Sequence, residues 1–199
     1  MSFRLGLTGS IGMGKSTTAA MFSDEGIPVW DADAAVHRLY APGQPAALAI
    51  ACLLPGAVDS DGGVNRTHLR GLIGEDPTVL DRINAAVHPL VAEDRARFLA
   101  ATAGAPIVLL DVPLLFESGI DAACDAVVVV SAPPEVQRKR VLMRGVTEAE
   151  FQIILSRQLP DPEKRARADY VVPTTDFDDA RSAVRDVLAD IRRRIAQDA

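Results

Sequence analysis

Residues 3–17 read FRLGLTGSIGMGKST, and this stretch decides the fold. Its first part alternates apolar residues with small or polar ones, which predicts a strand over residues 3–8. A helix is expected over 15–25, ended by Gly26. Between the two lies Gly9-x-x-x-x-Gly14-Lys15-Ser16, a complete phosphate-binding loop in the strand–loop–helix context that it requires.

The residue types of this loop suit a polyphosphate. Glycines let successive backbone N–H groups turn toward one centre, and the helix that follows adds its positive N-terminal end. Lys15 is expected to reach the β- and γ-phosphates, and the Ser16 hydroxyl is expected to ligate Mg²⁺. The chain should therefore bind a nucleoside triphosphate, which leaves kinases, GTPases and motor-like ATPases open.

Further apolar stretches predict the rest of a sheet. Strands are expected at 27–30, 107–111 and 126–130, with a weaker candidate at 170–172. The runs IVLLD and AVVVV lack alternation, which is typical of strands buried on both faces of a parallel sheet. With helical patterns between them, these strands predict a three-layer α/β/α domain with about five mostly parallel strands.

Residues 34–101 are mostly helical in pattern. They predict an insert over 34–103 between the second and third strands, and a nucleotide-binding core made of residues 1–33 and 104–199.

Several local signals mark helix boundaries. Asp76-Pro77 and Asp161-Pro162 each predict a cap followed by a first-turn proline, and Thr147-x-x-Glu150 fits a capping box. His88-Pro89 predicts an interruption of the helical stretch 78–101, because a residue before proline disfavours the α region.

Composition narrows the class of protein. The 199 residues fit one domain, with or without an insert, and 48% hydrophobic with 24% charged residues is ordinary globular composition. A net charge of -6 argues against nucleic acid as the main partner. No apolar run is long enough for a membrane span, and the N-terminus lacks the order of a signal peptide. We therefore expect a cytoplasmic protein without membrane or nucleic-acid partners, whose oligomeric state stays open.

A small-molecule kinase needs a group that orients the acceptor hydroxyl near the γ-phosphate. Asp31-Ala-Asp33 directly follows the strand at 27–30 and could supply it. A regulatory GTPase would need Asn-Lys-x-Asp, which is absent. Ligands of open α/β sheets bind at the carboxyl ends of strands, so both carboxylates should lie at the edge that holds the loop. Asp33 is the favoured acceptor of a hydroxyl proton, whereas Asp31 either joins it or caps the helix that follows.

Charge that could close over the phosphates is expected on a helix after the strand at 126–130. Arg140 and Arg144 are four residues apart and share a face. An arginine supplied to the transition state is worth roughly 10³–10⁵ in rate, and Arg140 is favoured for this role. Asp111 ends the strand at 107–111, where it either holds Mg²⁺ through water or only closes the strand.

Taken together, these motifs resemble the dephospho-coenzyme A kinase family over nearly the whole chain. The matching stretches are LTGSIGMGKST (7–17), VWDADAAVHRLY (29–40), INAAVHPLV (83–91), LLDVPLLFESG (109–119), APPEVQRKRVLMR (132–144) and RQLPDPEKRARADYVV (157–172). The resemblance implies ATP-dependent phosphorylation of the ribose 3′-hydroxyl of dephospho-CoA, the last step of coenzyme A synthesis. It also implies a P-loop kinase core, a helical acceptor-side insert and a lid around 140–150.

The resemblance also implies roles for particular residues. ATP would be bound by Gly12, Met13, Gly14, Lys15, Ser16 and Thr17, with Arg140 contacting phosphates from the lid and Arg144 beside it. Asp33 would be the candidate base, and Thr8, His88 and Pro113 would face the acceptor. One stretch departs from the family: VPTTDFDD at 172–179 lacks the Asn and Gly of the usual turn near adenine, so Thr174 or backbone groups are expected to substitute.

Two rival functions remain at this point. Another P-loop kinase would act on a nucleotide, a sugar or a shikimate-like acceptor. A nucleotide-dependent switch or assembly ATPase would hydrolyse ATP without a small acceptor.

Overall fold

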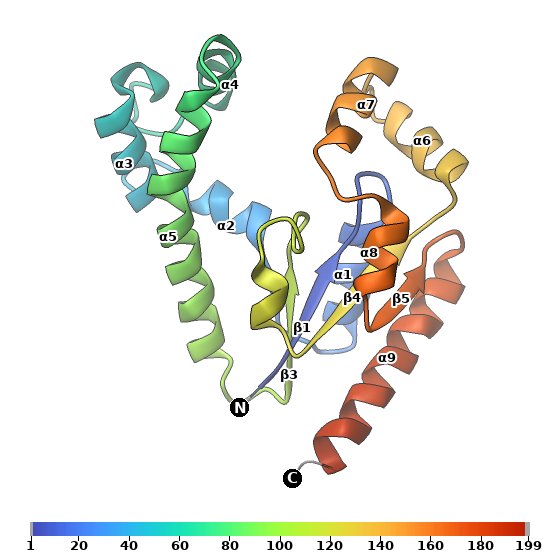
Figure 1. Cartoon of the computed structure of the whole chain (residues 1–199). Helices are drawn as coiled ribbons and strands as arrows, with labels where there is room; N and C mark the ends of the chain where they lie inside the picture. Colours follow the sequence, from blue (N-terminus) through green and yellow to red (C-terminus); the bar gives the residue numbers. More distant parts are fainter. Residues whose placement is uncertain (1, 198–199) are drawn as a thin grey trace. The chain divides into compact units, whose positions relative to one another are not determined.

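The structure, a computed structural model, describes residues 2–197 and contains a five-stranded sheet (Figure 1). The strands are β1 (Phe3–Thr8), β2 (Val29–Asp31), β3 (Ile107–Asp111), β4 (Ala126–Ser131) and β5 (Tyr170–Pro173). Their order is β2-β3-β1-β4-β5, and the β1–β3, β1–β4 and β4–β5 pairings are parallel. The predicted α/β class is confirmed.

The central strands are buried as their apolar runs predicted. Every residue of β3 is buried, as are the first five residues of β4. Strand β2 begins at Val29, two residues later than expected, because Pro28 has no N–H to donate to a ladder. The Pro28 carbonyl, however, accepts a hydrogen bond from the Leu109 N–H at 2.8 Å.

Five helices belong to the sheet-containing body within residues 2–197. They are α1 (Lys15–Asp24), α6 (Pro134–Leu142), α7 (Glu148–Ser156), α8 (Asp161–Arg167) and α9 (Phe177–Gln197), with a short 3₁₀ turn, η2 (Ile120–Ala123). In α9, Val184, Leu188 and Ile191 are fully buried at helical spacing and join one core with side chains of β1 and α1. Figure 1 shows α9 running along β5.

Residues Asp31–Ala101 form a second compact unit with its own core. It contains α2 (Ala32–Leu39), α3 (Pro45–Leu53), the 3₁₀ turn η1 (Pro55–Ala57), α4 (Arg66–Glu75) and α5 (Thr78–Ala101). Buried aliphatic side chains from these helices meet there, among them Leu39, Ile50 and Ile83. The unit begins at Asp31 and ends at Ala101. The insert predicted from the sequence spans 34–103.

The predicted capping box at Thr147 is confirmed, and so is the cap at Asp76, but α5 begins at Thr78, so Pro77 lies before its first turn. Asp76 accepts from the Thr78 N–H at 2.9 Å, and Thr147 and Glu150 form both hydrogen bonds of a capping box. The predicted cap at Asp161 is wrong: α8 begins at Asp161 itself, whose carboxylate is drawn to the Ser131 hydroxyl and to Arg165, each at 2.9 Å.

The predicted break at His88-Pro89 is also wrong, because α5 runs through Pro89. A proline removes one donor from the helix ladder, and a helix of 24 residues with Val79, Ile83 and Val87 buried keeps enough packing to tolerate that loss. Across residues 2–197, none of the helices has the length and apolar character needed to cross a bilayer.

Candidate active site

The loop between β1 and α1 has a backbone that only glycine permits at two points. A Cβ on Gly9 would lie 2.3 Å from Val130 Cγ2, and one on Gly12 would lie 2.6 Å from Val141 Cγ2. Gly12 also has φ +78°, which L side chains rarely adopt. No side chain within the described part of the chain caps α1 at Gly14, so the positive end of this helix is left for an anion.

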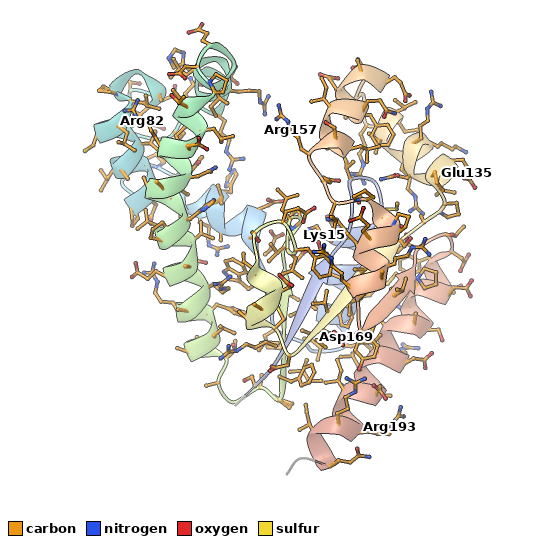
Figure 2. All side chains as sticks on the ribbon, viewed as in Figure 1. Lys15, Arg82, Glu135, Arg157, Asp169 and Arg193 are labelled. Atoms are coloured by element: carbon orange, nitrogen blue, oxygen red, sulfur yellow. The ribbon has the colours of Figure 1, made fainter. Side chains whose placement is uncertain are left out.

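Lys15 and Asp111 form an ion pair at the carboxyl end of the central strands. The Lys15 Nζ lies 2.6 Å from Asp111 Oδ1, and the two side chains are 14% and 2% exposed. The β1–β3 register, with Leu7 opposite Asp111, brings the two residues together. Figure 2 shows Lys15 at the end of the strands opposite to Asp169, whose carboxylate accepts from the Val127 N–H where β4 begins.

A metal ion at this edge would have few protein ligands. Among residues 2–197, no group of three or more His, Cys, Asp or Glu side chains is placed to hold one. Ser16 lies exposed in the first turn of α1, and Asp111 is the buried carboxylate at the end of β3. This oxygen set fits Mg²⁺, which is usually held by one or two protein oxygens together with substrate phosphates.

Thr8 and Pro113 are joined by a hydrogen bond. The Thr8 hydroxyl, which is fully buried, donates to the Pro113 carbonyl at 3.0 Å. That carbonyl also accepts from Lys164 Nζ at 3.4 Å. The loop after β3 is thereby tied both to the end of β1 and to α8.

Lys164 is a residue whose importance the sequence motifs do not indicate. Its side chain is completely buried, and its ammonium lies 2.9 Å from Glu117 Oε1. Burial alone would raise the pKa of Glu117, but the hydrogen bonds from Lys164 and from the Leu159 N–H outweigh it and hold that pKa below its ordinary value. The only signal in the sequence was that both residues lie in stretches shared with the family.

The sequence motifs also give no indication of the roles of Gln137 and Gln158. Gln137 donates to the Ile11 carbonyl at 2.8 Å, and Gln158 accepts from the Ile11 N–H at 3.0 Å. Both polar groups of one loop residue are therefore held by side chains from α6 and from the segment after α7. The 20 residues between these glutamines include the expected lid around 140–150.

Arg140 and Arg144 line one cavity of about 450 Å³ together with Gly14, Thr17, Thr174 and Phe177. Arg140 donates to the Thr174 carbonyl at 2.5 Å and to its hydroxyl at 3.3 Å. The Thr174 hydroxyl in turn donates to the Met13 carbonyl at 2.7 Å. Arg140 is thus connected to the phosphate loop through Thr174.

The remaining candidate residues belong to the second compact unit. Asp31 accepts from the Ala34 N–H at 2.9 Å, so it caps α2, which was one of its two predicted roles. Asp33 is exposed in the first turn of α2 and lines a cavity of about 510 Å³ with Tyr40, Arg66, Leu69 and Arg70, among others. His88 is exposed on α5 and is not among the residues lining this cavity.

Comparisons with known proteins identify the family of this chain. A family profile described as dephospho-CoA kinase matches residues 3–178. The dephospho-CoA kinases of Cereibacter sphaeroides and Ruegeria pomeroyi are 60% and 56% identical, over 96% of this chain and 96% and 97% of theirs.

Solved structures show the same fold. The Thermus thermophilus protein TT1252 aligns with a TM-score of 0.84 and 35% identity over 95% of this chain and 97% of its own. Dephospho-CoA kinase from Campylobacter jejuni aligns with a TM-score of 0.67 and 19% identity, over 96% and 97% of the two chains. The chain belongs to the dephospho-CoA kinase family, which uses ATP to phosphorylate dephospho-CoA in the final step of coenzyme A biosynthesis.

Proposed function

We propose that the phosphate loop transfers the γ-phosphate of ATP to the ribose 3′-hydroxyl of dephospho-CoA, with Asp33 accepting the hydroxyl proton. The observation that carries the nucleotide half of this proposal is the Lys15–Asp111 pair beside the glycine loop. It holds an ammonium at 2.6 Å from a nearly buried carboxylate, where the β- and γ-phosphates of a nucleotide in the loop would compete for it.

On the nucleotide side, Gly12, Met13, Gly14, Lys15, Ser16 and Thr17 would bind the triphosphate. Arg140 and Arg144 line the cavity that opens beside Gly14 and Thr17, so we assign them to phosphate contacts from the lid around 140–150. Ser16 and Asp111 would hold Mg²⁺, which neutralises charge on the phosphate oxygens during transfer.

The adenine contacts are expected in the same cavity. The Thr174 hydroxyl already donates to the Met13 carbonyl, so we assign Thr174 to holding the loop. Phe177 lines the cavity and is 55% exposed; the Arg181 guanidinium lies over its ring, 5.5 Å from the centroid, so a base would stack on the other face. This assignment accounts for the altered stretch 172–179 without an Asn or Gly.

On the acceptor side, the unit Asp31–Ala101 would bind dephospho-CoA, and Pro113 and His88 would face it. Thr8 was also expected to face the acceptor, but its side chain is fully buried and its hydroxyl donates to the Pro113 carbonyl, so we assign it to holding Pro113 in place. Asp33 needs little strength as a base, because phosphoryl transfer passes through a loose transition state and depends mainly on positioning and charge. Since Asp31 caps α2, Asp33 remains the carboxylate of the pair that is open to an acceptor.

The cytoplasmic location expected from the sequence remains a prediction.

The role of Asp33 is tested by Asp33→Asn, with Asp81→Asn on α5 as a control in the same unit. Losing a positioned proton acceptor should lower kcat by about 10²–10⁴, while the KM for ATP stays within about twofold. Initial rates of ADP release with dephospho-CoA give both constants. A variant with unchanged kcat and a raised KM for ATP would instead assign Asp33 to nucleotide or metal binding.

A further inference from the structure

The second compact unit contains a cavity whose chemistry extends beyond the single carboxylate of Asp33. Its floor is apolar, with Leu69 6% exposed and Val36 and Ile73 beside it. Arg66 and Arg70 also line it, from the first two turns of α4. The cavity of about 510 Å³ is within the size range of small-molecule sites.

Arg66 and Arg70 are four residues apart on α4, so their side chains leave the same face of that helix. The start of α4 is held by Asn65, whose side chain accepts from the His68 N–H at 2.8 Å. The Arg66 guanidinium lies over the Tyr40 ring, 5.4 Å from its centroid, which fixes its direction within the cavity.

Neither of these arginines is neutralised by the protein. Among residues 2–197, no carboxylate lies within 4.0 Å of the guanidinium of Arg66 or Arg70. In the same unit, Arg38 does pair with Asp94, at 2.9 Å. Two guanidinium groups without an ion-pair partner, lining a cavity that also holds apolar side chains, match an anionic ligand, and planar guanidinium groups match phosphate oxygens in particular.

We infer that Arg66 and Arg70 bind the diphosphate of dephospho-CoA. This inference rests on the proposed role of Asp33. In dephospho-CoA, the ribose that carries the 3′-hydroxyl carries the diphosphate on its 5′ carbon, a few bonds away. A cavity with a carboxylate for the hydroxyl and two guanidinium groups for the diphosphate therefore matches both ends of one ribose. The arginines select an acceptor with a 5′-diphosphate over a plain nucleoside.

The test compares Arg66→Gln and Arg70→Gln with Arg82→Gln, a surface change in the same unit that lies outside the cavity and removes a 3.4 Å bond to the Leu53 carbonyl. Each cavity variant should raise the KM for dephospho-CoA by about 10- to 100-fold, as expected for the loss of a charged hydrogen bond. The KM for ATP should change by less than about twofold, and the Arg82 variant should behave as wild type. Arg66→Lys and Arg70→Lys should recover part of the loss, since they keep the charge.

Ionic strength separates a diphosphate contact from a merely structural role. In the wild type, the KM for dephospho-CoA should rise with KCl, and this dependence should weaken in both glutamine variants. An unchanged salt dependence, or equal losses toward ATP and dephospho-CoA, would overturn the inference. If wild-type ADP release did not depend on dephospho-CoA at all, the proposed function would fail instead, so the two failures are distinguishable.

Discussion

Replacing either partner of the Glu117–Lys164 pair should destabilise the protein unequally. Glu117→Met leaves the Lys164 ammonium, which is 0% exposed, with only the Pro113 carbonyl, at 3.4 Å, as a partner among residues 2–197. Stranding one member of a buried ion pair typically costs about 3–5 kcal/mol. Lys164→Met leaves a carboxylate that is 20% exposed and still accepts from the Leu159 N–H at 2.7 Å, so its cost should be about 1–3 kcal/mol.

The double variant makes this reasoning sharper. With both groups replaced by methionine, neither charge of this pair is left without its partner, so the loss should be smaller than that of Glu117→Met alone. Urea unfolding gives the free energies, with the fluorescence of Trp30, 2% exposed and the only tryptophan, as the probe. Equal losses in the single variants, or losses that simply add in the double variant, would refute the argument.

The pair also predicts a pH dependence of stability. Because the pKa of Glu117 is lower in the folded state than its ordinary value of 4.5, its contribution is complete at higher pH. That contribution should fall away as the pH drops below about 4.5 and through the folded-state pKa. Glu117→Met should lose this part of the acid dependence, and a wild-type-like acid profile in that variant would contradict the assignment.

Three further predictions concern the phosphate loop. Lys15→Met should lower the rate of transfer by about 10²–10³ while the far-UV circular dichroism of the folded protein persists; a folded variant with normal turnover would remove the assignment. Gln137→Glu and Gln158→Glu add the same charge, but only the first loses a donor to the Ile11 carbonyl, so its KM for ATP should exceed that of the second by about tenfold; equal KM values would show that this bond does not position the loop. Thr174→Val should lower the free energy of unfolding by about 1–3 kcal/mol and raise the KM for ATP, with Thr174→Ser restoring both; thermal unfolding and kinetics without any change would mean that the bond to Met13 is dispensable.

The features that could be predicted from the sequence are those that depend on residues close together in the chain. The phosphate loop, the flanking strand and helix, and the buried central strands follow from local spacing and from apolar runs. The cap at Asp76 and the capping box at Thr147 are local in the same sense, since donor and acceptor lie two or three residues apart.

The features that were missed depend on contacts across the fold. Gln158 and Ile11 are 147 positions apart, and Gln137 and Ile11 are 126 apart, so no local pattern joins them. Lys164 lies in a basic run that is typical of a solvated helix face, and only tertiary packing buries it against Glu117. The Asp161 carboxylate does not cap its own helix, because it accepts a hydrogen bond from the Ser131 hydroxyl, 30 positions away.

The most direct test of the account is Mg²⁺-dependent ADP release from ATP with a panel of acceptors. The panel contains dephospho-CoA, AMP, adenosine, shikimate and no acceptor. We predict that dephospho-CoA strongly stimulates release, and that the product is CoA with its new phosphate on the ribose 3′-oxygen. Stimulation by another acceptor alone, or ADP release that ignores every acceptor, would contradict the account.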